Sequence, residues 1–174
     1  MTTIVAVKHD GHTAIAGDGQ VTLGEKYIMK GTAQKVRSIY HDSVVIGFAG
    51  GVADAFTLQD WLEKKLESYS GDLRRAAVEL AQDWRKDPTL QKLEAMLIAM
   101  DKNNLLVISG NGEVIDPDDD VVAIGSGGNF AQAAAIALNQ HTTAMSAEDI
   151  AKAAVNIAAD IDVYTNHNVI AKSF

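Results

Sequence analysis

Thr2 is the residue whose position suggests the most specific chemistry in this chain. It follows Met1 at the head of a β-branched run over residues 1–7, which is typical of a strand. If Met1 is removed, Thr2 carries a hydroxyl and a free α-amine. A hydroxyl needs a base to take its proton before it attacks, and an α-amine, with a pKa of roughly 7.7–8.0, can be that base. Thr2 is therefore either a nucleophile or an ordinary first strand residue.

Asp18 and Lys35 carry the charges that such a nucleophile would use. Asp18 lies between two glycines after a predicted strand, and Lys35 stands at the head of another. Alone, the aspartate would stabilise a turn and the lysine would be solvated. If both point at Thr2, the ammonium favours the neutral amine and the alkoxide, while Asp18 holds the lysine in place.

Two glycine pairs follow predicted strands. Gly50-Gly51 is either a turn or an oxyanion hole, because a backbone N–H without a side chain can approach a tetrahedral intermediate closely. Residues 125–128 (GSGG) precede a helix and could hold a phosphate. They lack the lysine of a P-loop and the GxGxxG spacing, so a tight turn is favoured.

Composition excludes several classes of protein. The 174 residues suit one domain over 1–174, and a net charge of −8 disfavours nucleic-acid binding. There is no cysteine, and the five histidines lack metal-ligand spacing, so disulfides and a zinc site are not expected. The acidic residues 116–120 lack EF-hand spacing. No run approaches the ~20 apolar residues of a membrane span, and no secretory signal is expected.

Hydrophobic periodicity predicts the elements that must position these residues. Asp10-Gly11 is a hairpin signal, residues 19–31 look like a loop, and Ser146 with Asp149 resembles a capping box. Strands are predicted over residues 1–7, 12–16, 35–40, 43–49, 95–100, 105–109, 113–115 and 121–124. Helices are predicted after Gly51, over 73–84, after Gly128 and after Ser146, with apolar faces that include Phe56, Phe130 and Ile157.

The order is strands, two helices, strands, two helices. It has no βαβ alternation, so a parallel sheet is disfavoured. Two antiparallel sheets packed together, with a helix pair outside each, would bury all the apolar faces. The predicted fold is therefore an α+β, four-layer αββα sandwich.

Eight short motifs occur in an order that resembles the proteasome-like N-terminal nucleophile hydrolases, over essentially the whole chain. They are residues 2–5 (TTIV), 15–20 (IAGDGQ), 29–31 (MKG), 35–37 (KVR), 47–57 (GFAGGVADAFT), 92–95 (KLEA), 124–128 (IGSGG) and 164–166 (YTN). The resemblance implies the same αββα fold. It also implies a threonine-type endopeptidase, the proteolytic subunit of an ATP-dependent protease.

The resemblance also assigns roles to residues. It implies Thr2 as the nucleophile, Asp18 and Lys35 as its charged partners, and the Gly50 N–H as the oxyanion donor. It places Ser126 near the terminal amine and Asp160 as the carboxylate that supports Ser126. A sodium ion is implied at Ala159, Asp162 and Thr165, and no organic cofactor is.

The assembly implied by the resemblance is a cytoplasmic dodecamer of two stacked hexameric rings. It would act on proteins and peptides with a hexameric AAA+ unfoldase, which uses the ATP. The chain departs from the family pattern by one extra residue around residues 25–28 and by a short C-terminus after Asn166. These departures bear on the substrate channel and on subunit contacts.

Two alternatives remain open at this stage. Another N-terminal nucleophile amidase, acting on a small molecule, would be favoured by an autocleaved propeptide or by a serine or cysteine nucleophile. Here Met1 directly precedes Thr2. A noncatalytic ring subunit is the other alternative, and the joint presence of Thr2, Asp18 and Lys35 argues against it.

Overall fold

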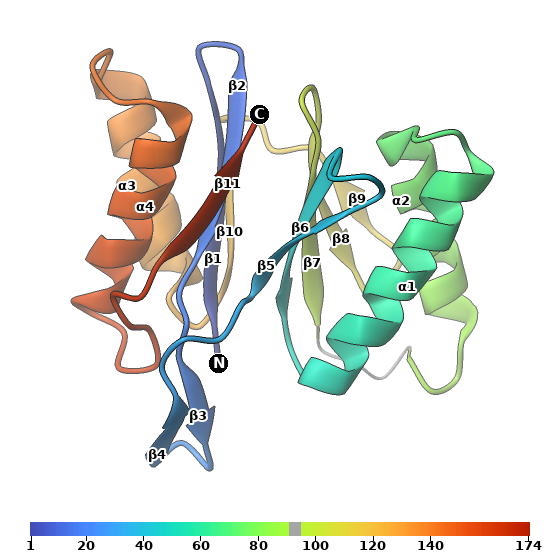
Figure 1. Cartoon of the computed structure of the whole chain (residues 1–174), viewed down its shortest axis with the longest axis horizontal. Helices are drawn as coiled ribbons and strands as arrows, with labels where there is room; N and C mark the ends of the chain where they lie inside the picture. Colours follow the sequence, from blue (N-terminus) through green and yellow to red (C-terminus); the bar gives the residue numbers. More distant parts are fainter. Residues whose placement is uncertain (91–94) are drawn as a thin grey trace.

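The computed structural model describes residues 1–90 and 95–174, so residues 92–94 of the predicted KLEA motif lie outside the described residues. Two sheets pack face to face and a helix pair covers the outside of each, as predicted (Figure 1). The strands are β1 (Thr3–His9), β2 (His12–Gly17), β3 (Val21–Leu23), β4 (Tyr27–Lys30), β5 (Val36–Ile39), β6 (Val44–Ala49), β7 (Met96–Met100), β8 (Leu105–Ser109), β9 (Val114–Ile115), β10 (Val121–Gly125) and β11 (Ile170–Ser173). The helices are α1 (Val52–Ser68), α2 (Leu73–Lys86), α3 (Gly128–His141) and α4 (Ala147–Ala159).

The sheet that begins at Thr3 has the strand order β10-β1-β2-β11. β1 and β2 form the predicted hairpin, and positive φ angles at Asp10 and Gly11 give the primed turn that suits its twist. On its other side β1 pairs antiparallel with β10, so Thr3 lies opposite Gly125. This pairing brings the start of the chain next to the GSGG turn.

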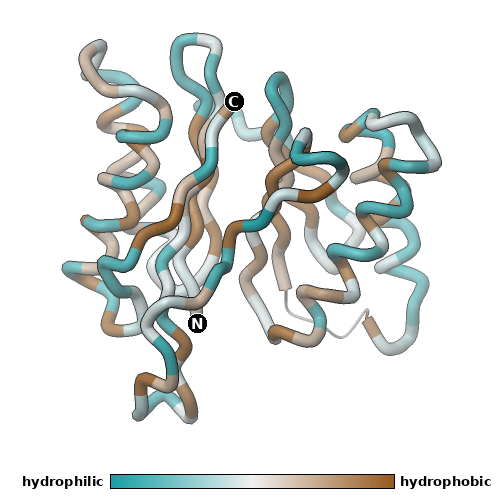
Figure 2. The backbone as a smooth tube through the Cα atoms, viewed as in Figure 1, coloured by the Kyte–Doolittle hydropathy of each residue, from teal (hydrophilic) through white to brown (hydrophobic). Residues whose placement is uncertain are grey.

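The second sheet has the order β5-β6-β7-β8-β9 and packs on the first. Ile4 and Ile15 of the first sheet meet Val45, Ile98 and Val107 of the second in a fully apolar layer. A Cβ on Gly47 would lie 2.7 Å from Ile4 Cγ2, so the glycine lets the two sheets approach closely. In Figure 2 hydrophobic segments run along the strands, and hydrophilic ones along the outer helix turns.

Helix faces follow the predicted periodicity only in part. In α2 the predicted face is confirmed, since Leu73, Leu80 and Trp84 are all buried. In α3 the prediction is wrong: Phe130 is exposed, and the small residues Ala131 and Ala135 face the sheet. Alanine allows that helix to pack closely against β1 and β10, and a bulky phenylalanine there would hold it away.

Two further sequence predictions on the helices differ from the structure. Phe56 of α1 and Ile157 of α4 are about half exposed, although both were assigned to apolar faces. The predicted capping box at the start of α4 is confirmed, with Ser146 and Asp149 bonding each other's backbone N–H.

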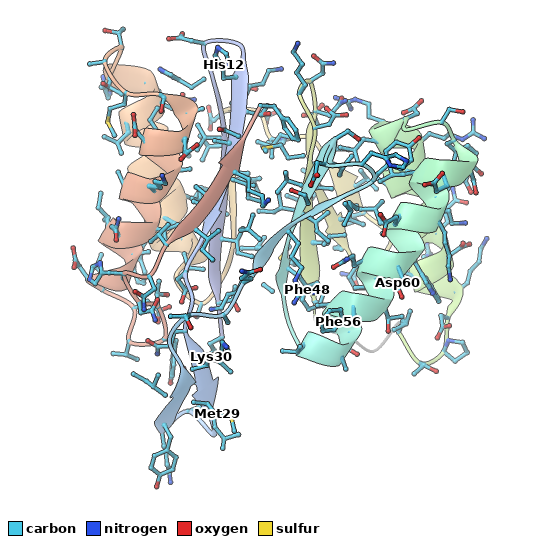
Figure 3. The ribbon with its side chains drawn as sticks, in the orientation of Figure 1. His12, Met29, Lys30, Phe48, Phe56 and Asp60 are labelled. Carbon is cyan, nitrogen blue, oxygen red and sulfur yellow. The ribbon has the colours of Figure 1, made fainter. Side chains whose placement is uncertain are left out.

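Residues 19–31 were predicted as a loop, and this is wrong in part. They contain the β3–β4 hairpin, which projects from the body of the molecule (Figure 1). Met29 lies on the projecting part of this hairpin and Lys30 nearer its base (Figure 3). Its side chains Leu23, Tyr27, Ile28 and Met29 are 55–69% exposed, so no buried face marks them as strands in the sequence.

Strand β11 was also missed. It pairs antiparallel with β2, and Phe174 and Thr13 exchange backbone hydrogen bonds next to it. No helix in the described part of the chain is long and apolar enough to cross a membrane.

Candidate active site

Thr2 lies immediately before β1 and is 7% exposed. It lines a cavity of about 80 Å³ at the end of the sandwich where α1 begins. Lys35, Gly50 and Phe48 share its wall, and Figure 3 shows Phe48 and Phe56 beside the first turns of α1. The remaining lining residues are Gln34, Arg37, Ile46, Val52, Ala55 and Gln59. The predicted nucleophile, lysine and oxyanion glycine therefore meet in one cavity.

Asp18 is 1% exposed and fully hydrogen-bonded. Its Oδ1 accepts from Lys35 Nζ at 2.8 Å and from the Thr3 N–H at 3.0 Å. Its Oδ2 accepts from the N–H groups of Gln20 at 2.9 Å and Asn166 at 3.3 Å. A buried carboxylate is tolerated only when it is compensated in this way. Asp18 thus ties the lysine to the residue that follows Thr2.

Lys35 is largely buried, and burial lowers the pKa of its ammonium from the ordinary 10.5. The charge and hydrogen bond of Asp18, and more weakly the charge of Asp162, act in the opposite direction. The side chain of Lys35 is 10% exposed. A desolvated cation acts more strongly on groups that line the same cavity than a solvated one would.

Gly50 has a φ of +154°, a conformation that glycine adopts and other residues avoid. A Cβ there would lie 2.8 Å from the ring of Phe48. The turn therefore needs glycine at this position, and its backbone borders the cavity. A role for its N–H at an oxyanion stays a prediction.

Ser126 is itself exposed and joins a polar network whose other members, Asp162, Thr165 and Thr3, are buried. Its Oγ donates to Asp162 Oδ2 at 2.7 Å and lies 3.4 Å from the Thr2 carbonyl oxygen. Thr165 donates to the same Asp162 oxygen at 2.6 Å, so Thr3 donates to Thr165 across 2.7 Å. The network links the chain before β1 to the turn after α4.

The carboxylate that holds Ser126 is therefore Asp162, and the assignment of this role to Asp160 is wrong. Asp160 caps the end of α4, is 70% exposed at its side chain and contacts His167. In the turn after α4, Asp162 is buried, whereas Asp160 remains on the surface. The sequence marked Thr3 and Asn166 only as parts of motifs and gave them no role.

The GSGG turn depends on its glycines. Gly125 has a φ of +97°, and a Cβ there would lie 1.7 Å from the Thr2 carbonyl oxygen. A Cβ on Gly127 would lie 2.2 Å from Thr3 Oγ1. These glycines allow the backbone of β10 to lie against Thr2, in agreement with the predicted tight turn.

The predicted sodium ligands lie where α4 ends. Ala159 is its last residue, and the Asp162 carbonyl accepts a bond from Thr165 N–H at 3.1 Å. Helix ends present carbonyl oxygens with partial negative charge, which suits a hard cation. No cluster of three His, Cys, Asp or Glu ligands occurs in the described ranges.

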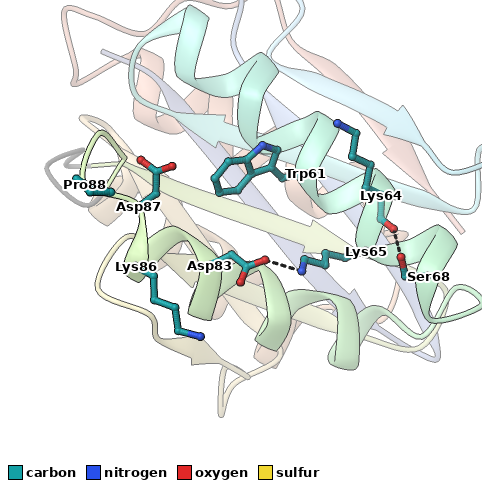
Figure 4. Close-up of a pocket in the computed structure, with 8 residues that line it drawn as sticks. All are labelled: Trp61, Lys64, Lys65, Ser68, Asp83, Lys86, Asp87 and Pro88. Atoms are coloured by element: carbon teal, nitrogen blue, oxygen red, sulfur yellow. Dashed lines mark hydrogen bonds and ion pairs between the residues drawn. The ribbon is translucent and has the colours of Figure 1, made fainter.

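A larger groove of about 560 Å³ lies between α1 and α2 (Figure 4). It contains none of the predicted catalytic residues. Its one hydroxyl, Ser68, donates to the Lys64 carbonyl of its own helix, and Lys65 pairs with Asp83. Without an activated nucleophile, this groove is not the candidate active site.

An αββα sandwich with a threonine at the head of its first strand, in a cavity that it shares with the lysine of a buried Asp–Lys pair, is the arrangement of a proteasome-like threonine hydrolase. The chain belongs to the proteasome subunit family, whose sequence profile matches residues 1–173.

Within that family it is similar to proteins named ATP-dependent protease subunit HslV. The protein of that name from Lacticaseibacillus casei is 77% identical over 174 residues and both full lengths. The one from Enterococcus faecalis is 64% identical over 97% of this chain and 93% of its own. The crystal structure of HslV from Trypanosoma brucei has a TM-score of 0.92 and 48% identity, over 99% of this chain and 98% of that one.

Proposed function

We propose that this chain is the proteolytic subunit of an ATP-dependent protease and cleaves peptide bonds with Thr2. The observation that carries the proposal is the Asp18 carboxylate. It joins Lys35 to the backbone next to Thr2, and Thr2 and Lys35 line one small cavity. The high identity to protease subunits over both full lengths supports the same function.

The reaction follows from the placement of the groups. Thr2 Oγ attacks the peptide carbonyl while the free α-amine of Thr2, directly or through a water, takes the hydroxyl proton. The Gly50 N–H stabilises the oxyanion. The tetrahedral intermediate then expels the peptide amine, which takes up that proton, and an ester to Thr2 remains. Water attacks the ester, releases the acid product and restores the Thr2 hydroxyl.

Removal of Met1 is part of this proposal. Met1 makes the Thr2 nitrogen an amide, whose lone pair is delocalised into the carbonyl and cannot take a proton. Met1 is 45% exposed, so its bond to Thr2 lies near the surface. We expect active protein to lack Met1 by intact-mass measurement. Peptide hydrolysis at the full rate by protein that retains Met1 would overturn the terminal-amine mechanism.

Substitution at Thr2 tests the nucleophile directly. Thr2→Ala should abolish hydrolysis of a fluorogenic peptide and keep the fold, whereas Thr2→Ser should retain part of the activity. Turnover by Thr2→Ala at the wild-type rate would remove Thr2 from the mechanism. Absence of peptide hydrolysis by the processed wild-type protein is the result that would reopen the two alternatives, a noncatalytic ring subunit and another kind of amidase.

We further propose that the subunit assembles into two stacked hexameric rings and works with hexamers of the AAA+ unfoldase HslU. The exposed apolar hairpin β3–β4 supports self-association, because large apolar patches on a subunit usually mark an interface. The words "ATP-dependent" and "subunit" in the relatives' name support a partner that uses ATP. We also propose that the assembly is cytoplasmic, as the resemblance implies, and cell fractionation tests this.

The partner makes a testable difference between substrates. Short peptides should be cleaved by the ring alone, whereas a folded protein should be degraded only with the unfoldase and ATP. Equal degradation of a folded substrate without them would contradict the partnership.

Sodium at Ala159, Asp162 and Thr165 is proposed as a structural ion. When bound, it would fix the turn that carries the Asp162 carboxylate. Replacing sodium by a larger monovalent cation should lower the unfolding temperature, measured at constant ionic strength. An unfolding temperature independent of the cation would count against the site.

A further inference from the structure

We propose that Asn166 is a positioning residue which holds Asp18 and fastens the base of the β3–β4 hairpin to it. The inference rests on the proposed function, because it concerns how the Asp18–Lys35 pair is kept beside Thr2. Asn166 lies in the turn after α4 and is partly buried. Its backbone and its side chain do different things.

The backbone of Asn166 reaches the active site. Its N–H donates to Asp18 Oδ2 at 3.3 Å, on the opposite oxygen from the one that accepts from Lys35. Two bonds thus lie between Asn166 and the lysine ammonium. A shift of this turn would rotate the carboxylate that Lys35 depends on.

The side chain of Asn166 joins the two ends of the hairpin. Its Oδ1 accepts from the Gly19 N–H at 3.1 Å, just before β3. Its Nδ2 donates to the Gly31 carbonyl at 2.9 Å, just after β4. A primary amide carries an acceptor and a donor on two separate atoms, so it can bond both segments at once. The side chain therefore closes the base of the hairpin, as a tie between two backbone segments.

Those two segments lie in close contact. A Cβ on Gly19 would be 2.6 Å from the Gly31 carbonyl oxygen, and Ala33 N–H donates to the Gly19 carbonyl at 2.9 Å. Lys35 follows two residues after Ala33. Movement of the exposed hairpin is therefore transmitted to Lys35 along the chain and to Asp18 through Asn166. A neighbour that grips the hairpin would thereby help to set the geometry of the active site.

Asn168 provides a matched control. Its Nδ2 also donates to the Gly31 carbonyl, at 2.7 Å. Asn168→Ala therefore removes a bond to the same hairpin carbonyl and leaves the bonds of Asn166 to Gly19, Gly31 and Asp18 in place. A role limited to anchoring the hairpin would make the two asparagines equivalent.

The test compares Asn166→Ala, Asn166→Asp and Asn168→Ala in peptide hydrolysis, with the assembled state checked by sedimentation. Both Asn166 variants should lower kcat by about tenfold or more with KM within about twofold, since misplaced catalytic groups slow chemistry more than binding. Asn166→Asp shares the loss because a carboxylate cannot donate to Gly31 and places a second negative charge near Asp18. Asn168→Ala should keep kcat within about twofold.

Three results would overturn the proposal. They are wild-type kcat in an assembled Asn166 variant, an equal loss of kcat in Asn168→Ala, and unfolding of the near-isosteric Asn166→Asp, which would show a role in the fold. If Asn166→Ala alone fails to fold, Asn166→Asp decides. Thr2→Ala distinguishes failure of the proposed function from failure of the proposal about Asn166. Activity of Thr2→Ala would reject the proposed function, whereas normal turnover in the Asn166 variants would reject only the positioning role of Asn166.

Discussion

Asp160 and Asp162 are two positions apart and lie in opposite environments. Asp162 is buried, and its Oδ2 accepts from Ser126 and Thr165, whereas Asp160 is on the surface. Asp162→Asn should lower kcat for a peptide by about tenfold or more. The oxygen that accepts from both hydroxyls would then be the neutral oxygen of an amide, and hydrogen bonds to a neutral acceptor are weaker. Asp160→Asn is the control and should be near wild type. Equal losses would restore Asp160 to the site.

Lys35 gives the site a dependence on alkaline pH. Because burial lowers its pKa below 10.5 in the folded state, the unfolded state binds more protons between the lowered pKa and 10.5. Unfolding free energy contributed by this group therefore rises with pH across that window. Wild type should gain stability relative to Lys35→Met there, as measured by denaturant unfolding. A difference that does not change with pH would refute the buried ammonium.

The same substitution tests the chemistry. Lys35→Met should lower kcat/KM for a peptide by about 10²-fold or more, because a preorganised charge beside a reacting group has a large effect on rate. Lys102→Met, at the exposed turn between β7 and β8, is the matched control and should leave the rate unchanged. Wild-type turnover by Lys35→Met would exclude the ammonium from the mechanism.

At the scale of elements, the pairing of β1 with β10 determines where Thr2 lies. Gly125→Ala should displace the Thr2 backbone, since its Cβ would overlap the Thr2 carbonyl, and it also adds the strain of a positive φ, about 1–3 kcal/mol. We expect a lower unfolding temperature and loss of peptidase activity. Gly128→Ala is the control in the same turn, where a Cβ meets nothing closer than 3.5 Å. Similar behaviour of both variants would contradict this account.

The elements that the sequence predicts well are those whose period is imposed by burial on one face. Helix α2 and the β1–β2 hairpin are of this kind. The order of the four layers was also predicted, because it follows from which faces of the elements are apolar. The β3–β4 hairpin and β11 were missed for a physical reason. The hairpin buries neither face, and β11 is a four-residue edge strand with intermediate burial and no clear alternation.

The candidate site was predictable only where a residue's role follows from its type. Thr2, Asp18 and Lys35 meet in the structure as expected, while the choice between Asp160 and Asp162 failed. Both follow the last turn of α4 in sequence, and the direction of a side chain after a helix end depends on the turn that the chain then takes. The role of Asn166 could not be predicted from the sequence either. Its side chain bonds to Gly19 and Gly31, which are more than 130 positions away.

For the whole molecule, the hairpin predicts how subunits associate. Replacing Tyr27 and Ile28 by serine should yield smaller species in sedimentation and leave the unfolding of the subunit nearly unchanged, since both side chains are about two-thirds exposed. Val78→Ser, on the outer face of α2, is the control and should leave the oligomer intact. A full-sized assembly from the hairpin variant would place the interface elsewhere.

The pairing of Thr3 with Gly125 has a consequence for biosynthesis. Thr2 becomes part of a site only after more than 120 residues have been made. The long segment between β1 and β10 must then bring these two strands together. Contacts so distant in sequence form slowly, because loop closure must precede them. A nascent chain therefore carries Thr2, still behind Met1, long before the turn that Thr2 contacts has been made. The pairing of β1 with β10 thus delays completion of the site until late in folding.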